Sequence, residues 1–501
     1  MYIHKASLEN FKGFLGKHEI TFNKGINFFV GNNNCGKTTI FKAVEFILSK
    51  GEKASFIHKN CDDNQDVSVE IEFRGDDIKR LCEHGNLKKY MSYIIDNDDG
   101  STSLRILRSS KLDNIIQDKR NKNLDIKNVR IFNPNTNQFE NPTGIDTTIS
   151  ELFDAQFVYS DLKNEDYQDF GKTKLVGKII NSITRNFQET DVFRELQEAH
   201  NRAFGDEGLI QILKDIQNKI QSVLVGQYGD AEVEFNFGLP EIDNFLKNGN
   251  IMLSDNGIKT NVSEKGTGMQ RALALSLIQV YAEIDRESSD DNIEKPILFF
   301  IDEPETFLHP GAQNKLLNAL ERLSDNSQIF ITTHSPYLLK NFDKNKHQIY
   351  IFSKNESTNK IDRKEILKLF GNSSPTWGEI NYCAFGVTSV EFHNELYGFL
   401  QSIATSDDRE NYREENFDNW LVNKEIPQTK RYNRLNRDGT TRQEYKTLPT
   451  FIRNVIHHPE NTHNRFSPEE LVTSIEHLIC ILNQLTNRQT EENNIMGTQI
   501  R

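Results

Sequence analysis

The sequence is short of cysteine, of positive charge and of long apolar runs. Its five cysteines, at positions 35, 61, 82, 383 and 480, form no Cys-x-x-Cys pair. A zinc knuckle or a disulfide framework is therefore not expected, and the composition suits a reducing compartment. No apolar run approaches the roughly 20 residues that span a bilayer, so we expect no membrane contact. The first residues lack the build of a secretion signal, which predicts a cytoplasmic location.

The charge balance limits how the surface can interact. Lys and Arg number 60 against 73 Asp and Glu, a net charge of −13 over 501 residues. The surface as a whole will repel nucleic acid, so any such contact requires a local basic patch. The length allows two to four domains with a full-sized core, and the sequence shows no internal repeat.

A glycine-bounded loop near the N-terminus carries the clearest chemical signal. Residues 26–30 predict a buried strand, 31–39 read Gly-Asn-Asn-Asn-Cys-Gly-Lys-Thr-Thr, and 40–48 show an apolar helical pattern. This is the P-loop arrangement, in which backbone N–H groups and a helix N-terminus face phosphates. We expect ATP and Mg²⁺ here, with the Lys37 amine at the β- and γ-phosphates and the Thr38 hydroxyl on the metal. The expected nucleotide-binding residues are Gly31, Asn32, Asn33, Asn34, Cys35, Gly36, Lys37, Thr38 and Thr39.

A second small-residue loop opens an apolar helix after residue 266. It reads Gly-Thr-Gly-Met-Gln-Arg over 266–271. Exposed N–H groups at a helix N-terminus suit negative charge, although an ordinary helix cap is the alternative. The residues expected to face a nucleotide are Gly266, Thr267, Gly268 and Gln270.

Two further apolar strands end in polar residues. Residues 297–301 precede Asp302-Glu303-Pro304-Glu305, and 329–333 precede His334. Ligands of parallel α/β sheets bind at the carboxyl ends of strands. We therefore expect Asp302 to hold Mg²⁺, Glu303 to act as general base, and His334 to touch the γ-phosphate. A purely structural histidine is the alternative for His334.

The remaining N-terminal pattern predicts the frame around these motifs. Residues 2–8 and 19–22 predict an antiparallel ribbon, and three alternating segments, 66–74, 103–108 and 129–132, predict an antiparallel sheet over 60–140. Residues 157–159 and 349–352 predict further core strands. A helical arm is expected from apolar spacing over 174–224, and a hairpin from 233–237 paired with 251–255.

This succession resembles the ABC-type ATPases of the SMC/RecF/OLD class. The resemblance rests on the Asn-Phe-x-x-Phe turn at 10–14, the P-loop, the Gly-x-Gly-x-Gln-Arg loop, the Asp-Glu-Pro-Glu-x-x-Leu-His-Pro run at 302–310 and His334. It implies that two copies enclose ATP, one offering Lys37 and Thr38 and the other Thr267 and Gly268. Residues 305–309 would lie at that seam, and Gln156 is a weak candidate for the Q-loop.

The sequence differs from the SMC/RecF/OLD class in two respects, and each argues against a function that members of the class have. The arm is far shorter than the coiled coils of SMC proteins and has no zinc-hook cysteines, which puts long-range DNA tethering in doubt. The region after residue 355 lacks the strand-end acids of the Toprim nuclease that OLD-type proteins carry, so we expect no Toprim domain in this chain.

The C-terminal segment predicts a mainly α-helical unit. Residues 390–400 predict an amphipathic helix, 405–446 are hydrophilic with a basic stretch at 430–437, and a last helix starts after Ser467 with a capping box to Glu470. Arg453-Asn454-x-x-x-His458 resembles the motif of HEPN ribonucleases. The resemblance implies RNA cleavage without metal, with Arg453 stabilising phosphorane charge, His458 transferring protons and the basic stretch holding RNA. A docking fold, a polar contact in an oligomerisation module, and a solvated basic loop remain open.

The expected fold is therefore α/β: an ABC-type head with a flanking antiparallel sheet, a helical arm and a mainly α C-terminal domain. The expected domains are residues 1–165, 166–230, 231–355 and 356–501. By resemblance to the ATPase subunits of the PARIS and Septu anti-phage systems (AriA and PtuA), we expect an oligomeric ATPase that senses infection and regulates a separate nuclease effector. The alternatives are a self-contained, ATP-gated ribonuclease acting on tRNA, like the PrrC-type anticodon nucleases, and a RecF-like DNA-repair ATPase.

Overall fold

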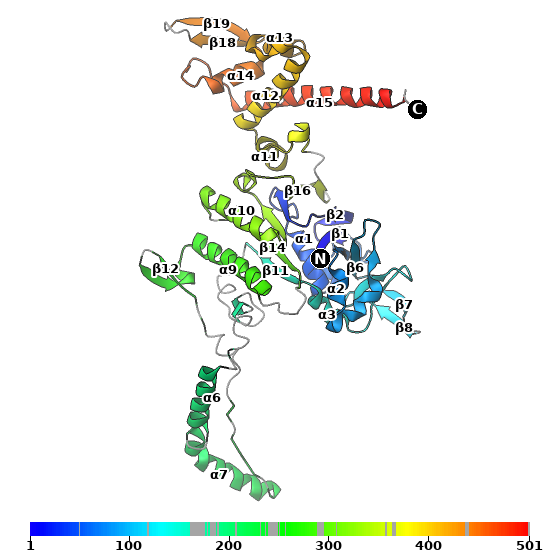
Figure 1. Ribbon diagram of the computed structural model, residues 1–501, viewed down its shortest axis with the longest axis vertical. Coiled ribbons are helices and arrows are strands. Elements are labelled where there is room, and N and C mark those ends of the chain that lie inside the picture. Colours follow the sequence, from blue (N-terminus) through cyan, green and yellow to red (C-terminus); the bar gives the residue numbers. More distant parts are fainter. Residues whose placement is uncertain are drawn as a thin grey trace. The chain divides into compact units, whose positions relative to one another are not determined.

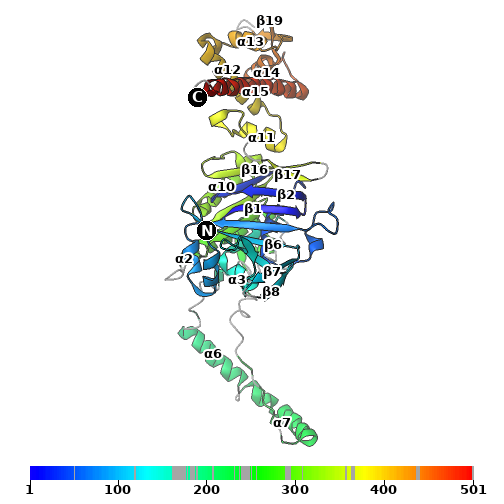
Figure 2. The same cartoon turned by 90° about the vertical axis from the view of Figure 1, so that its right-hand side faces the viewer.

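The computed structural model describes most of the chain, in two compact units (Figures 1 and 2). One unit comprises residues 1–158 with 296–501, and the other comprises residues 159–295. The described residues are 1–49, 51–117, 120–160, 176–177, 179–180, 187, 190–205, 208–230, 232–235, 237–238, 249, 251–255, 257–287, 295–306, 308–355, 358–362, 367–435 and 440–498.

An antiparallel sheet forms one layer of the larger unit (Figure 2). Its strands follow the order β10-β9-β6-β4-β1-β2, and β5 pairs with β6. Burial alternates along β4, because one face of the sheet packs on the core and the other meets solvent. The predicted flanking sheet is confirmed. The strands are β1 (Tyr2–Phe11), β2 (Phe14–Thr21), β4 (Ser68–Arg74), β5 (Ile95–Asp96), β6 (Thr102–Ser109), β9 (Val129–Asn133) and β10 (Gln138–Glu140).

The second sheet is parallel except at one edge, and it confirms the α/β fold class. Its order is β11-β14-β15-β3-β16-β17, with only β17 antiparallel to its neighbour. Every residue of β3, β14 and β15 is buried, as expected of central parallel strands. The strands are β11 (Asp154–Val158), β14 (Ile297–Asp302), β15 (Gln328–Thr333), β3 (Ile26–Gly31), β16 (His347–Lys354) and β17 (Asn359–Asp362).

Aromatic side chains fill the core of this parallel sheet. The rings of Phe300 and Phe330 stack with centroids 4.8 Å apart, and Phe29 packs near both Phe330 and Tyr350. The same packing fixes the register of β3, β14 and β15, so their carboxyl ends meet at one edge. The surrounding elements of this unit are α1 (Thr39–Leu48), η1 (Lys53–Ser55), α2 (Ile78–Cys82), η2 (Gly85–Tyr93), β7 (Asp113–Gln117), β8 (Arg120–Leu124), α3 (Ile145–Leu152), α10 (Pro310–Ser324) and η5 (Pro336–Leu339).

The smaller unit contains the predicted arm and the second glycine loop. The expected helical spacing over 174–224 gives α6 (Asp191–Phe204) and α7 (Leu209–Tyr228), although Leu175 and Ile183 lie outside the described residues. The predicted hairpin is wrong in its pairing. Strand β12 (Met252–Asp255) pairs with β13 (Ile258–Asn261), because Gly257 adopts a positive φ of 81° and closes a short turn there. The unit ends with η4 (Val262–Glu264) and α9 (Thr267–Glu287).

The C-terminal segment is mainly helical, as predicted, with one addition. The basic stretch forms the antiparallel hairpin of β18 and β19 instead of a loop, because Tyr432 and Lys446 point inward and are buried. The expected capping box is present: Ser467 accepts from the Glu470 N–H, and Glu470 accepts from the Ser467 N–H. The elements are η6 (Gly371–Ser373), α11 (Trp377–Phe385), α12 (Val390–Asp407), η7 (Arg409–Tyr412), α13 (Glu414–Val422), β18 (Lys430–Leu435), β19 (Thr441–Lys446), α14 (Leu448–His457) and α15 (Pro468–Thr498).

Among the described residues, no helix combines the length and the apolar character that crossing a bilayer demands.

Candidate nucleotide-binding site

The P-loop joins the end of β3 to the start of α1, and two of its glycines are required by geometry. Gly31 has a φ of 134°, and a Cβ there would lie 2.1 Å from the carbonyl oxygen of Phe352. Gly36 has a φ of 91°, and a Cβ there would lie 2.5 Å from the Asn359 amide nitrogen. Any other residue would be strained at these positions and would collide with neighbouring strands. The loop can therefore hold its tight turn only with glycine at both ends.

Lys37 lies inside this turn. Its Nζ donates to the carbonyl oxygens of Gly31, at 3.1 Å, and Asn32, at 3.0 Å, and lies 2.8 Å from His334 Nε2. Burial lowers the pKa of Lys37, while nearby acids, Glu303 and Asp302 among them, act in the opposite direction. The amine is thus fixed at the centre of the loop, where a P-loop lysine meets phosphate. Cys35 is also buried, and its thiol donates to the Asn32 carbonyl oxygen at 2.8 Å.

The side-chain oxygens of Thr38 and Asp302 lie within hydrogen-bonding distance of each other. The Thr38 hydroxyl donates to Asp302 Oδ1 at 2.9 Å, and the Thr332 hydroxyl donates to the same oxygen at 2.6 Å. A hydroxyl and a carboxylate are the hard oxygen donors that Mg²⁺ prefers, and two protein ligands are typical where phosphates and waters complete the shell. These two residues therefore fit Mg²⁺.

Glu303 adopts an unusual backbone conformation directly after β14. Its φ is 45°, in the left-handed region, and its N–H donates to both the backbone oxygen and the hydroxyl oxygen of Thr332, each at 3.0 Å. Non-glycine residues in this region concentrate at functional sites, where surrounding structure holds them. Its Oε1 lies 3.3 Å from His334 Nε2. Burial lowers the pKa of His334, and Lys37 adds to that effect, while Glu303 and Asp302 act in the opposite direction; the lowered pKa favours the neutral imidazole.

Lys37, Thr38, Glu303 and His334 line one pocket of about 610 Å³, and Asp302 adjoins it through its hydrogen bond with Thr38. Its lining combines the P-loop with the residues that follow β14 and β15, and it consists of Asn33, Asn34, Gly36, Lys37, Thr38, Thr39, Glu303 and His334. The structure thus brings together the lysine, the hydroxyl, the two acids and the histidine that the sequence singled out.

Glu305 binds the loop that carries His334, a contact that the sequence did not reveal. Its Oε1 accepts from the Thr333 hydroxyl at 2.7 Å, the His334 N–H at 2.9 Å and the Ser335 N–H at 3.2 Å. Gln313 of α10 accepts from the Ser335 hydroxyl at 2.6 Å. Burial raises the pKa of the Glu305 carboxyl, while the hydrogen bond from Thr333 opposes the shift. Glu305 and Gln313 therefore fix the loop that carries His334. The one signal in the sequence is the second acid of Asp-Glu-Pro-Glu, which the resemblance to ABC-type ATPases predicts at a seam between copies.

The second glycine loop lies at the start of α9. Thr267 is the first residue of the helix, and Gly266 and Gly268 leave its first turn open to solvent. Gln270, by contrast, is buried, and its amide donates to the carbonyl oxygens of Ser263 and Lys265. Gln270 therefore shapes the loop in this structure, and its contact with a nucleotide stays a prediction.

Two other expected residues lie away from the pocket lining. Gln156 is in the middle of β11, and its amide donates to Asp154 Oδ2 at 2.6 Å, so nothing in this geometry supports a Q-loop role. His309 is the N-cap of α10, where its ring nitrogen accepts from the Gly311 N–H at 3.2 Å.

The C-terminal motif places its three residues in different surroundings. The Arg453 guanidinium lies 5.2 Å from the centroid of the Tyr397 ring. Asn454 is buried and donates to Glu414 Oε1 at 2.9 Å, a carboxylate that Lys446 also contacts at 3.2 Å. His458 is the C-cap of α14; its side chain is 54% exposed, and Nδ1 lies 3.1 Å from Glu460 Oε1. Of the three, the histidine is exposed, the arginine is half-buried and the asparagine is buried.

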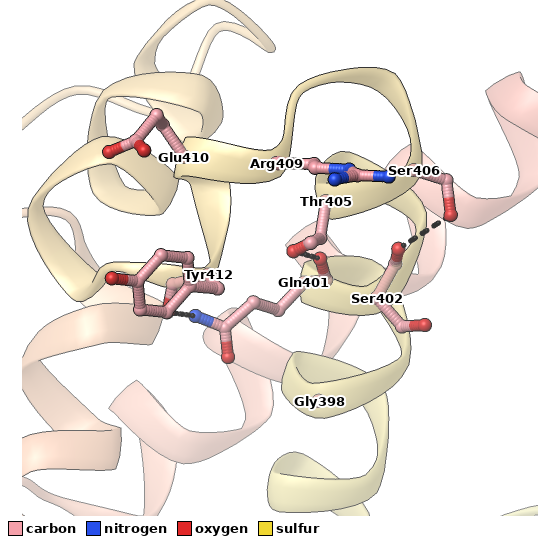
Figure 3. Close-up of a pocket in the computed structure, with 8 residues that line it drawn as sticks. All are labelled: Gly398, Gln401, Ser402, Thr405, Ser406, Arg409, Glu410 and Tyr412. Atoms are coloured by element: carbon pink, nitrogen blue, oxygen red, sulfur yellow. Dashed lines mark hydrogen bonds between the residues drawn. The ribbon is translucent and has the colours of Figure 1, made fainter.

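A second pocket, of about 770 Å³, lies between the end of α12 and η7 (Figure 3). Its hydroxyls bond to the preceding turn: Thr405 donates to the Gln401 carbonyl oxygen and Ser406 to that of Ser402. The Gln401 side chain donates to the Tyr412 carbonyl oxygen. None of the sequence-predicted site residues lines this pocket.

The sequence of this chain is similar to those of known proteins. The Old nuclease of Escherichia phage P2 is 29% identical over 366 residues, which cover 69% of this chain and 59% of that protein. The endonuclease GajA of Bacillus cereus (strain HuB5-5) is 22% identical over 387 residues, covering 67% and 55%. This chain thus spans a little over half the length of these curated relatives.

A solved structure of an SMC head bound to the C-terminal winged-helix domain of ScpA aligns with 72% of this chain and 98% of its own, with a TM-score of 0.42 and 15% identity. Residues 1–339, which include the P-loop, Asp302, Glu303 and His334, match the family described as AAA ATPase domain. This chain therefore belongs to the AAA ATPase domain family.

Proposed function

We propose that this protein hydrolyses ATP between paired heads and uses that cycle to regulate a nuclease effector in anti-phage defence. The observation that carries the proposal is the meeting of Lys37, Thr38, Asp302, Glu303 and His334 within hydrogen-bonding reach at the ends of three neighbouring strands.

The chemistry follows from the position of each group. The Glu303 carboxylate would orient a water molecule and take its proton as the water oxygen bonds to the γ-phosphorus. The bond from that phosphorus to the bridging oxygen breaks, leaving ADP and phosphate. The Lys37 ammonium would neutralise charge on the transferred group, and neutral His334 would hydrogen-bond to it. Thr38 and Asp302 would hold Mg²⁺, which neutralises the phosphate oxygens when it is bound.

The pairing of heads rests on the second glycine loop. An open helix N-terminus at Thr267, with glycine on both sides, is suited to a phosphate group. In ABC-type ATPases of the class that the motifs resemble, this loop meets the nucleotide held by a second copy. We propose the same arrangement here, as a dimer of heads or a higher oligomer.

The regulatory role rests on the relatives. Two proteins that match about two thirds of this chain are named nucleases. Among the residues that the structure describes, no group of three or more acidic, histidine or cysteine side chains could hold a metal ion for nuclease chemistry. This favours a separate effector protein, acting on DNA or tRNA, held or released by the ATPase.

The decisive experiment compares Lys37→Ala in the P-loop with Lys42→Ala in the first turn of α1. Lys42 is partly exposed and pairs with Glu45 at 2.9 Å, so its loss should cost little. We expect Lys37→Ala to lower ATP hydrolysis about 100-fold or more, and to abolish the dimerisation that a non-hydrolysable ATP analogue induces in the wild type. Hydrolysis at the wild-type rate in Lys37→Ala would refute the assignment. A monomer in saturating analogue would refute the paired heads.

A second candidate function is a self-contained, ATP-gated ribonuclease. The observation that favours it is the exposure of His458 at the end of α14, beside an arginine that stacks on Tyr397. The hairpin adds Arg431, Arg434 and Arg442 as exposed cations on a chain that is otherwise acidic. Exposed basic and aromatic side chains are features of surfaces that bind single-stranded RNA. Cleavage of RNA by the purified protein would favour this candidate over a separate effector.

A further inference from the structure

The backbone just after His334 is tied to the first helix beyond the ATPase sheet. The indole N–H of Trp377, at the start of α11, donates to the carbonyl oxygen of Pro336 at 3.0 Å. Pro336 is two residues from His334 and begins η5. The Tyr337 ring and the Lys340 amine also contact Trp377, at 6.2 Å and 5.9 Å from its ring centroid. The loop that carries His334 is therefore held at two places. Glu305 binds its backbone at His334 and Ser335, and Trp377 binds it at Pro336.

The same helix is fixed to α12. The Thr376 hydroxyl, at the N-cap of α11, donates to Glu395 Oε2 at 2.6 Å, and the Gly378 N–H donates to Glu395 Oε1 at 3.3 Å. Gly378 allows the two helices to touch, because a Cβ there would lie 2.8 Å from the Phe392 Cα.

Helix α12 is in turn part of the C-terminal core. Its Phe392 and Leu396 are fully buried in the hydrophobic cluster formed with α13, α14 and α15. A displacement of α11 would therefore strain the contacts of α12, since tightly packed elements move together.

We propose that Trp377 is a positioning residue for His334, and that α11 thereby couples the nucleotide site to the C-terminal helices. The proposal rests on the proposed ATPase function. Glu305 and Gln313 anchor the loop to the ATPase core, whereas Trp377 anchors it to α11. A shift of His334 toward the γ-phosphate pulls on the Pro336 carbonyl and through it on α11. Coupling between two sites is reciprocal, so whatever binds or restrains the C-terminal helices also changes the affinity for nucleotide.

The chain offers a direct probe of this link, because it contains two tryptophans, Trp377 and Trp420. Trp420 lies on α13, stacked on Phe417. It takes part neither in the Trp377–Pro336 hydrogen bond nor in the contacts of Glu395 with α11. In the Trp420→Phe variant of the full chain, Trp377 is the sole tryptophan. We expect its fluorescence emission to change when Mg²⁺ and a non-hydrolysable ATP analogue are added. In the double variant Lys37→Ala with Trp420→Phe, the same addition should leave the emission unchanged. A nucleotide-insensitive emission, in a protein shown by equilibrium dialysis to bind the analogue, would overturn the proposal.

Kinetics provide the second arm. Trp377→Phe keeps an aromatic ring but removes the indole N–H that donates to Pro336. We therefore expect kcat for ATP hydrolysis to fall about two- to tenfold with KM nearly unchanged. Trp420→Phe should leave both constants at their wild-type values. A normal kcat in Trp377→Phe would overturn the positioning role.

Glu395→Gln separates the two halves of the link. Glutamine has no charge and only one of the two acceptor oxygens that bind Thr376 and Gly378 in the wild type. The substitution leaves the Trp377–Pro336 contact intact. We expect kcat to stay near wild type, while nucleotide no longer alters hydrogen exchange in α12. Exchange that still responds as in the wild type would overturn the coupling through α11. A wild-type protein that neither binds nor hydrolyses ATP would instead refute the proposed function itself.

Discussion

The nucleotide pocket and the Arg453–His458 motif are both sets of polar residues, but they are built in opposite ways. The pocket brings Lys37 together with Asp302 and His334, which lie more than 250 positions further along the chain, and holds them by hydrogen bonds. The motif lies within six consecutive residues at the end of one helix, and its histidine is half exposed. Spatial convergence of distant residues is unlikely to arise by chance, whereas a short contiguous pattern arises easily. The pocket is therefore the stronger basis for a function.

Glu303→Gln should give the largest effect at the pocket. The amide cannot take a proton from water, so we expect ATP hydrolysis to fall about 10²- to 10⁴-fold while ATP binding is retained. Closed head dimers should accumulate with ATP, which size-exclusion chromatography with light scattering would detect. Hydrolysis near the wild-type rate would remove Glu303 from the role of general base.

His458→Ala tests whether the Arg453–His458 motif has a catalytic function. If the C-terminal helices cleave RNA, removing the exposed imidazole should lower cleavage about 100-fold or more, with ATP hydrolysis unchanged. His463→Ala, which removes another exposed histidine from the same loop region, is the matched control. Equal RNA integrity and equal toxicity in both variants would leave the motif without a catalytic function.

Acid should destabilise the C-terminal helices through His393. This imidazole is fully buried, with Nε2 3.0 Å from the Ser474 hydroxyl, and burial lowers its pKa to about 4. The unfolded chain binds a proton near pH 6.5 and the folded chain does not, so stability falls as pH drops from 6.5 to 4. The loss is about 3 kcal/mol in the free energy of unfolding.

Hydrogen exchange of α12 and α15 in the full chain, followed from pH 7 to 4.5 and corrected for the intrinsic rate, measures this effect. His393→Gln preserves a polar partner for Ser474 but does not titrate. It should therefore show a shallower pH dependence than the wild type. Parallel slopes in the two proteins would contradict the assignment.

Glu305→Ala should give the smallest effect, because it acts through another residue. Without the carboxylate, the N–H groups of His334 and Ser335 lose their acceptor and the loop loosens. We expect kcat to fall about tenfold with little change in ATP affinity. Glu305→Gln retains a carbonyl acceptor and should recover most of the rate. If both variants matched the wild type, the loop would be held by Gln313 and Trp377 alone.

Much of the ATPase frame was predictable because its signals are local. Apolar runs followed by glycine, an acid or histidine identified β3, β14 and β15, and alternation identified β4 and β6. The hairpin pairing of β12 was not predictable, since residues 233–237 alternate as well as 258–261 do, and only the turn at Gly257 decides between them. The hairpin of the basic stretch is not predictable from the sequence, because a hairpin made of charged residues lacks an apolar pattern. It forms because Tyr432 reaches the C-terminal core.

The amino-acid sequence by itself determined which residues can bind phosphate and metal, because a glycine loop, a lysine, a hydroxyl and paired acids have that chemistry in any setting. Only the tertiary structure decided that Glu305 turns inward to hold the histidine loop and that Trp377 reaches Pro336. Such contacts depend on the register of buried strands and the docking of one helix, and neither leaves a periodic trace in the sequence.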